Sequence, residues 1–366
     1  MSKTSHLKSL FLLVLAIIFG NKAFAQLEEV GNMIAAGEQD AKLLLQPYIA
    51  PAINGFGAAQ AGGWYNTAEP HKLGGFDITF TANVAMAPKK YSTFLINNNE
   101  LSFLKLQDPS LNETQTVVGE NIDGPQLVYH VMDNNNNVVY TQNAFRMPEG
   151  LNVRYVPSPM IQAGIGLIKG TEVMVRYMPN IKLEGNELGL WGIGGKHDIK
   201  QWIPGLKKLP LLKVSVMYGY TKLHTLIVLN VTPENINAES LPEEQANNNW
   251  EDQYMKLWVK SHTANLLIGA DLKVVSFYGG IGFASSKTNL KMEGDFPYVG
   301  LDATYQPVVK TVTDPIDMEI ENKDGSFTKP RLNLGVRFKL AIVTLHFDYS
   351  WANYSVFTAG LGFSYR

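Results

Sequence analysis

Residues 331–366 alternate between apolar side chains and polar or small ones over three successive stretches, 331–340, 341–350 and 357–366. In the last stretch, Phe363 and Tyr365 belong to the apolar row, while glycine, serine and threonine fill much of the other row. Because successive side chains of a β-strand point to opposite faces, this period of two predicts strands with one apolar and one polar wall. Repeated strands of this kind are typical of antiparallel barrels that cross an outer membrane.

The first 25 residues have the features of a secretory signal peptide. Lys3 and Lys8 precede an apolar run at 10–19, and the small-residue pattern Ala23-Phe24-Ala25 follows. We therefore predict export and cleavage between Ala25 and Gln26. An uncleaved anchor is the weaker alternative, since the run is too short to span a hydrocarbon core of about 30 Å. Together with the strands, the signal predicts the outer membrane of a Gram-negative bacterium, with outer-membrane lipid and the barrel-assembly machinery as partners.

Ten strands can be read from the period-two pattern in residues 74–87 and from residue 159 onward. The connections between them alternate in length, as in bacterial barrels with short periplasmic turns and long outer loops. Residues 88–158 show no clear pattern, and we expect them to add two or four strands. The sequence thus predicts an all-β fold, an antiparallel transmembrane barrel of 12–14 strands over residues 74–366. One inner connection, residues 198–210, mixes apolar and basic side chains and predicts a short amphipathic helix at the membrane surface.

Residues 26–73 lack the strand pattern. Residues 38–46 predict a short helix that ends at Pro47, and a tract of small residues follows. Such a tract lets backbones approach closely, so its composition fits a flexible linker and a plug inside the barrel equally well. In the plug hypothesis both chain ends start on the periplasmic side. The close-approach points would then be Gly55, Gly57, Gly62 and Gly63.

Charged residues on the polar rows of the strands define the predicted lumen. Placing Arg337 towards lipid would cost about 2–4 kcal/mol near the midplane, which favours the inward direction. Both signs of charge occur, so the wall suits a salt-bridged, plugged interior as well as an open channel. His346 and Asp348 share a face, and we interpret them as a polar pair of the wall. The residues predicted to face the lumen are Glu172, Arg176, Arg331, Arg337, Lys339, His346 and Asp348.

Signals of an enzyme are few in this sequence. It contains no Cys, which excludes disulfides, thiolate catalysis and thiolate metal sites. It also lacks a Gly-x-Ser-x-Gly nucleophile motif and a His-Glu-x-x-His zinc motif. The formal net charge of -2 gives no reason to expect nucleic acid as a partner. We therefore predict a protein that is not an enzyme, with no catalytic residues, no cofactor, no metal and no nucleic-acid partner.

Three stretches, 159–167, 171–179 and 192–204, resemble an uncharacterised family of Gram-negative outer-membrane barrels. That family is similar to the FadL-type transporters of long-chain fatty acids, and the resemblance extends in organisation over residues 40–366. It implies a 14-stranded barrel, closed by an N-terminal hatch, that passes hydrophobic compounds passively. The chain departs from the usual assembly signal because it ends on Tyr365-Arg366 instead of an aromatic residue.

Several functions remain open on the sequence alone. The first is passive uptake of small hydrophobic molecules such as fatty acids, which would be ligands of the barrel. The second is a structural or surface-binding barrel with a sealed lumen. An outer-membrane hydrolase is a less favoured alternative, because it needs a nucleophile close to a base. A secreted soluble β-protein fits the alternation but not the regular change of connection lengths.

Overall fold

A computed structural model describes residues 31, 33–34, 37–132, 138–183, 185–236, 238–244, 250–304, 306–321 and 330–365. The predicted signal peptide and its cleavage site at Ala25 lie outside the described residues. In the part of the chain that is described, no helix has both the length and the apolar character needed to cross a membrane.

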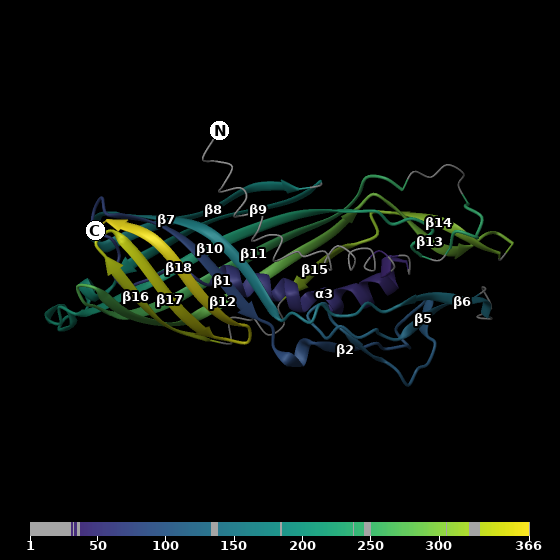
Figure 1. Cartoon of the computed structure of the whole chain (residues 1–366), viewed down its shortest axis with the longest axis horizontal. Helices are drawn as coiled ribbons and strands as arrows, with labels where there is room; N and C mark the ends of the chain where they lie inside the picture. Colours follow the sequence, from purple (N-terminus) through teal and green to yellow (C-terminus); the bar gives the residue numbers. More distant parts are fainter. Residues whose placement is uncertain are drawn as a thin grey trace.

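Ten antiparallel strands close into a barrel, in which the first strand pairs with the last (Figure 1). Each of the other strands pairs with its neighbours in chain order, apart from the small strands described below. Closure leaves the barrel no unpaired edge. The barrel strands are β1 (Phe76–Met86), β7 (Tyr155–Gly166), β8 (Thr171–Leu183), β9 (Asn186–Asp198), β10 (Leu212–Leu229), β11 (Gln253–Asp271), β12 (Val275–Glu293), β16 (Arg331–Leu340), β17 (Val343–Trp351) and β18 (Ser355–Tyr365).

The predicted barrel class is confirmed, but its strand number is ten in the described residues instead of 12–14. The ten strands read from residues 74–87 and from 159 onward are those that close the barrel. The described residues between β1 and β7 instead form small separate sheets, because their short strands pair with one another. These are β2 (Thr93–Leu95), β3 (Leu104–Leu106), β4 (Glu113–Gln115), β5 (Gln126–Met132) and β6 (Val138–Arg146), after the 3-10 turn η1 (Lys89–Tyr91).

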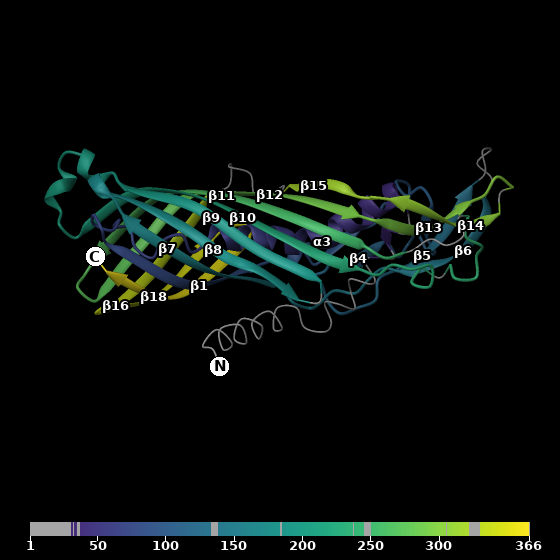
Figure 2. The same cartoon turned by 90° about the horizontal axis from the view of Figure 1, so that it is seen from above.

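The two ends of the barrel differ in their connections. One end, the turn end, carries the short connections at 167–170, 199–211, 272–274 and 341–342, together with the end of β18. The other, the loop end, carries a cap formed by the described parts of residues 87–154, 230–252 and 294–330 (Figure 2). The cap also contains β13 (Asp295–Leu301), β14 (Pro307–Thr313) and β15 (Asp317–Glu321), the last of which pairs with β12.

The predicted amphipathic helix at residues 198–210 is wrong as an α-helix. The chain forms two single 3-10 turns there, η3 (Lys200–Trp202) and η4 (Leu206–Lys208). Pro204 lacks a backbone N–H, and Gly205 has a φ of 91°, so a continuous helix cannot pass this point. Another 3-10 turn, η2 (Ile168–Gly170), joins β7 to β8.

One long helix, α3 (Glu38–Ala61), lies along the long axis of the molecule, from the cap into the barrel (Figure 1). We predicted that it would end at Pro47, and it instead continues through Pro47 and Pro51. Each proline removes a backbone hydrogen bond. The helix persists because it is enclosed by the cap core and the barrel wall, where packing overrides local propensity.

The two faces of the barrel strands have opposite character. Phe363 and Tyr365 point outward and are 57% and 63% exposed, whereas Gly362 and Ser364 on the same strand are buried inside. A continuous apolar band of this kind is stable only against an apolar medium, so the fold is that of an outer-membrane β-barrel. Members of the band include Ile78, Phe80, Ile161, Ile165, Val175, Ile193, Val216, Leu266, Ile268, Phe277, Ile281, Leu334, Leu345 and Leu361.

We expect Leu361→Lys to reduce the amount of folded protein recovered from membranes. Leu361 is 52% exposed and pairs with Phe80 and Leu345 within the apolar band. A lysine there would lose its water, at a cost of about 2–4 kcal/mol near the midplane. The matched control is Leu95→Lys in the cap, where the side chain is 69% exposed to water. Equal losses from both variants, measured by membrane yield, would contradict the assignment of faces.

Candidate functional site

Residues 38–73, which we call the lumenal segment, run from the cap into the barrel and fill its inside. It consists of α3 and the irregular stretch that leads from α3 to the start of β1. Helix α3 contacts strands on several sides of the wall, among them β1, β7, β11, β12 and β18. Lumen-facing polar side chains such as Thr81, Thr221 and Thr358 are at most 1% exposed, so solvent does not reach them.

The N-terminal end of α3 is fixed at the loop end of the barrel. The buried carboxylate of Asp40 accepts hydrogen bonds from the backbone N–H groups of Ser102, Phe103 and Leu104 at 2.6–2.8 Å. Met33 and Ile34, which precede the helix, belong to the apolar core of the cap. The segment therefore enters the barrel from the loop end and runs towards the turn end. We expected the segment to enter from the side on which both chain ends lie, and it instead enters from the end of the barrel opposite the end of β18.

Small residues let α3 pass close to the wall, and the four glycines singled out in the sequence all lie at such contacts. A Cβ on Gly55 would stand 2.6 Å from Val156, and one on Gly57 would overlap Ser286. A Cβ on Gly62 would stand 3.2 Å from Val356. Gly63 has a positive φ of 65°, and a Cβ there would stand 2.8 Å from Asn83 and from Thr81.

We expect Gly57→Ala to destabilise the folded protein, although helix propensity alone favours alanine by about 1 kcal/mol. The added methyl group would overlap both Oγ and Cβ of Ser286, and rotation of the hydroxyl relieves only one of these contacts. Overpacking of this kind costs about 1–3 kcal/mol. The control is Gly195→Ala, whose Cβ would meet nothing closer than 3.8 Å. Chemical unfolding in detergent measures the stability of both variants. If Gly57→Ala were instead more stable than the unmodified protein, the packing between Gly57 and Ser286 would be loose enough to admit a methyl group.

Two arginines of the barrel wall hold the C-terminal end of α3. Arg176 on β8 donates from Nη1 to the carbonyl of Gln60 and from Nη2 to that of Gly62, both at 2.7 Å. Arg331 on β16 donates to the carbonyl of Ala61, also at 2.7 Å. The last carbonyls of a helix have no partner within it, and they carry its partial negative charge. The helix has no basic residue in its own last turn, so the wall supplies the cations.

The indole of Trp64 fills the space just beyond the helix. The guanidinium of Arg176 lies 3.7 Å from the centre of its ring, in a cation–π contact. Gly194 and Gly219 face the ring from β9 and β10, and a Cβ on either would collide with it. Gln162 joins the contact, because its amide donates to the carbonyl of Trp64 at 3.1 Å and its oxygen accepts from Arg176 at 2.8 Å.

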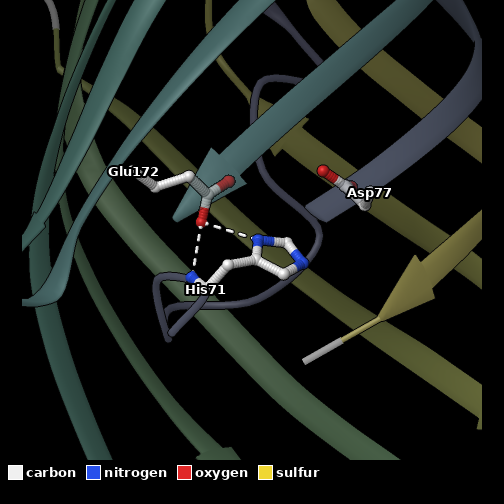
Figure 3. Close-up of side chains that lie close together, drawn as sticks. All are labelled: His71, Asp77 and Glu172. Carbon is white, nitrogen blue, oxygen red and sulfur yellow. Dashed lines mark hydrogen bonds and ion pairs between the residues drawn. The ribbon is translucent and has the colours of Figure 1, made fainter. Parts of the chain in front are cut away.

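Near the turn end, the lumenal segment is bound to the wall through an ionic contact at His71 (Figure 3). The carboxylate of Glu172 accepts a hydrogen bond from the backbone N–H of His71 at 2.9 Å and lies 3.0 Å from its Nδ1. Lys196 on β9 places its ammonium 3.1 Å from the same oxygen. All three side chains are buried. The other ring nitrogen of His71 lies 3.3 Å from the hydroxyl of Ser364.

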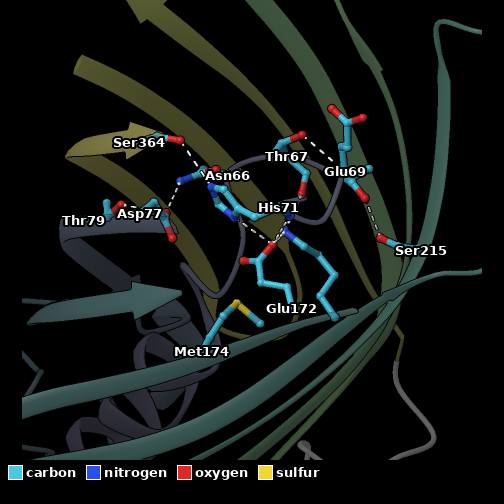
Figure 4. A network of polar contacts seen from close by, with 12 residues as sticks. Asn66, Thr67, Glu69, His71, Asp77, Thr79, Glu172, Met174, Ser215 and Ser364 are labelled. Carbon is cyan, nitrogen blue, oxygen red and sulfur yellow. Dashed lines mark hydrogen bonds and ion pairs between the residues drawn. The ribbon is translucent and has the colours of Figure 1, made fainter. Parts of the chain in front are cut away.

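Further polar contacts surround this cluster and fix residues 66–69 (Figure 4). They join the lumenal segment to three strands of the wall, β1, β10 and β11. The pairs are Asn66 with Asp77 (3.4 Å), Thr67 with Asp271 (3.2 Å), Glu69 with Lys213 (2.6 Å) and the carbonyl of Ala68 with Ser215 (2.7 Å).

His71, Asp77 and Glu172 also form a group that could hold a metal ion, since their ligand atoms lie within 4.8 Å of one another. The donor set does not fit a cation well, because the ammonium of Lys196 already lies against Glu172. A metal ion there would face a buried positive charge. We therefore interpret the group as an ion-pair contact between segment and wall.

Of the seven residues predicted to face the lumen, Glu172, Arg176, Arg331, Arg337, His346 and Asp348 are buried inside the barrel, and Lys339 is half-buried near the turn end. Asp348 accepts hydrogen bonds from Asn333 at 2.7 Å and from Tyr278 at 3.2 Å. Neither ring nitrogen of His346 has a hydrogen-bond partner in the described residues. His346 and Asp348 thus share the wall without bonding to each other.

Sequence reasoning did not find Trp64, His71 or Lys196. Lys196 could have been found, because strand alternation places it on the inward face of β9 together with Gly194. His71 and Trp64 lie in an irregular stretch without a period, so no local signal indicated their direction.

Solved structures similar to the chain include the translocator domain of the autotransporter NalP from Neisseria meningitidis. The two sequences are 9% identical, the match covers 84% of this chain and 92% of the translocator domain, and the TM-score is 0.27. The toluene transporter TbuX from Ralstonia pickettii has 7% identity, coverages of 81% and 90% and a TM-score of 0.21. The outer membrane protease OmpT from Escherichia coli has 7% identity, coverages of 80% and 97% and a TM-score of 0.25.

No curated protein matches the chain. One family model, described as a family of unknown function (DUF6588), matches residues 1–365. The match extends over the lumenal segment, the barrel and the cap alike. The chain therefore belongs to the DUF6588 family.

Proposed function

We propose that the protein is an outer-membrane barrel with a sealed lumen, whose function lies at its outer face. The observation that carries this proposal is the burial of lumen-facing side chains against a segment held at both ends. Asp40 attaches the segment at the cap, and Arg176 and Glu172 attach it to the wall. The loop end faces outward, since long loops of bacterial barrels lie on the outer side.

The cap supplies a surface for binding in this proposal. A cleft of about 710 Å³ opens beside the sheet of β3, β5 and β6. Lys105 and the apolar residues Leu106, Pro109 and Val128 line it together with uncharged polar side chains and one imidazole. The uncharged polar side chains and the imidazole include Asn98, Gln107, His130, Thr141 and Asn143.

Passive uptake of small hydrophobic molecules such as fatty acids is the second candidate. The observation that favours it is the pair Pro47 and Pro51, where α3 passes from the cap towards the barrel and lacks two backbone hydrogen bonds. A helix bends more readily at such a point, so the segment could be displaced as a gate. The inner wall offers such a molecule one apolar surface, the buried cluster of Met178, Leu190, Leu223 and Val259 on β8 to β11.

Conductance in planar bilayers distinguishes the two candidates. We expect the intact protein to give no steady conductance and deletion of residues 27–60 to give open pores. Because a deletion can prevent folding, the double variant Arg176→Ala/Arg331→Ala provides a second route to a loosened segment. Steady conductance of the intact protein, or fatty acid bound to it in native mass spectrometry, would favour uptake over the sealed barrel.

A further inference from the structure

A row of lysines crosses the outside of the barrel. Cross-strand register places Trp191 of β9 opposite Lys222 of β10, Lys222 opposite Lys260 of β11, and Lys260 opposite Lys287 of β12. On the other side of Trp191, Tyr177 of β8 continues the row. Two aromatic residues and three lysines therefore lie side by side on five neighbouring strands.

The row faces outward and lies at the upper edge of the apolar band. The adjacent residues Thr221, Ser261 and Thr288 are buried inside, so alternation directs the lysines outward. Lys222 is ten residues from the start of β10 at Leu212. At about 3.3 Å per residue and a tilt of about 45°, this corresponds to about 23 Å along the barrel axis, close to the height of about 25 Å typical of the membrane-facing band.

Most lysines in this region are paired with acidic side chains, and Lys222 and Lys260 are the exceptions among the described residues. Lys287 pairs with Glu319, and Lys256 pairs with Glu293. Glu293 and Asp314 also lie close to Lys291, and Glu187 pairs with Lys182. In the part of the chain that the structure describes, no carboxylate lies within ion-pair distance of Lys222 or Lys260.

Like charges directly opposite each other on neighbouring strands are destabilising. Lys222 and Lys260 occupy such positions, with Cβ atoms expected about 5 Å apart. Below them, Val216 of β10 and Leu266 of β11 continue the apolar band. The surface thus combines two unneutralised ammonium groups, neighbouring aromatic rings at the headgroup level, and an apolar wall for acyl chains.

We propose that Lys222 and Lys260 bind a phosphate group of a lipid in the outer leaflet. The phosphate bridges the two ammonium groups and removes their repulsion, while the acyl chains lie against the apolar band. This proposal rests on the membrane placement given under the proposed function, with the loop end outward. It does not depend on whether the lumen is sealed.

Native mass spectrometry of the full chain in detergent, with bisphosphorylated lipid A as the probe, tests the proposal. We expect Lys222→Gln/Lys260→Gln to lower the affinity about thirtyfold, from the loss of two charges at a membrane surface. The control Lys207→Gln/Lys208→Gln removes the same charge at the turn end and is expected to change the affinity by less than about twofold. Lys287→Gln, which loses an already paired charge, is a second control in the same row.

Three outcomes would overturn the proposal. One is an equal loss in the turn-end control, which would indicate non-specific attraction. Another is binding of inorganic phosphate as tight as that of lipid A, which would indicate a soluble anion. The third is unchanged affinity in the double variant. Heat-dependent gel mobility confirms that each variant is folded, and Lys222→Arg/Lys260→Arg should keep the affinity. The sealed lumen is tested separately by bilayer conductance, so a negative result for lipid binding does not count against the sealed-barrel proposal.

Discussion

Glu172→Gln is expected to lower the free energy of unfolding by about 3–5 kcal/mol, because it leaves a buried ammonium without its counter-charge. Lys196 and Glu172 are each 2% exposed, and their charged atoms are 3.1 Å apart. The substitution also weakens the contact with His71, so the lumenal segment loses its attachment near the turn end. Urea unfolding of the protein in detergent measures the change.

Glu187→Gln is the matched control for this prediction. It removes the same charge from an ion pair with Lys182, whose side chain is 69% exposed. Exposed pairs contribute about 0–1 kcal/mol, so the control should be nearly neutral. A comparable loss from the two variants would mean that the buried cluster contributes no more than a surface pair.

Arg176→Ala is expected to destabilise the protein by about 3–5 kcal/mol and to loosen α3. Two helix carbonyls and the amide oxygen of Gln162 lose a charged donor, and Trp64 loses its cation–π partner. Arg176→Lys should restore little, because a single ammonium cannot reproduce the planar fork of donors above the ring. Unfolding in detergent and Trp fluorescence report the two effects.

Arg146→Ala is the control for Arg176, since its side chain in the cap is 56% exposed and its contact with Asp123 measures 4.0 Å. Its loss is expected to stay within about 0.5 kcal/mol. If Arg176→Ala behaved like this control, the wall arginines would not be what holds the end of α3.

The barrel was predictable from the sequence because its signal is periodic. Strands such as β16 and β18 expose apolar residues every second position, and that pattern alone assigned their faces. The strand number was not predictable in the same way, because β5 and β6 also form a hairpin, but β5 pairs with β3 in the cap. Sequence alternation indicates a strand without indicating the sheet to which it belongs.

The contents of the lumen were predictable only in part. Alternation placed Arg176 and Arg331 inside the barrel, but their partners are backbone carbonyls of α3, which leave no trace in the side-chain pattern. The length of the helix was underestimated. A proline such as Pro47 ends a helix that is exposed to water, but α3 continues through it because the cap and the barrel wall pack around the helix. The direction of the segment depends on Asp40 and its contact with residues 102–104, which is a tertiary feature.

Single-cysteine labelling tests the central claim, that the lumenal segment enters from the loop end and seals the barrel. The chain contains no Cys, so each introduced thiol is unique. Glu38→Cys reports on the start of α3, Lys208→Cys on the turn end, and Thr221→Cys on a lumen position that is 0% exposed. With a membrane-impermeant maleimide on intact cells, we expect Glu38→Cys to react and Lys208→Cys to react only after the membrane is opened. Thr221→Cys should react only after the protein is unfolded by heat. If it reacted in the native protein as fast as Lys208→Cys does, the lumen would not be sealed.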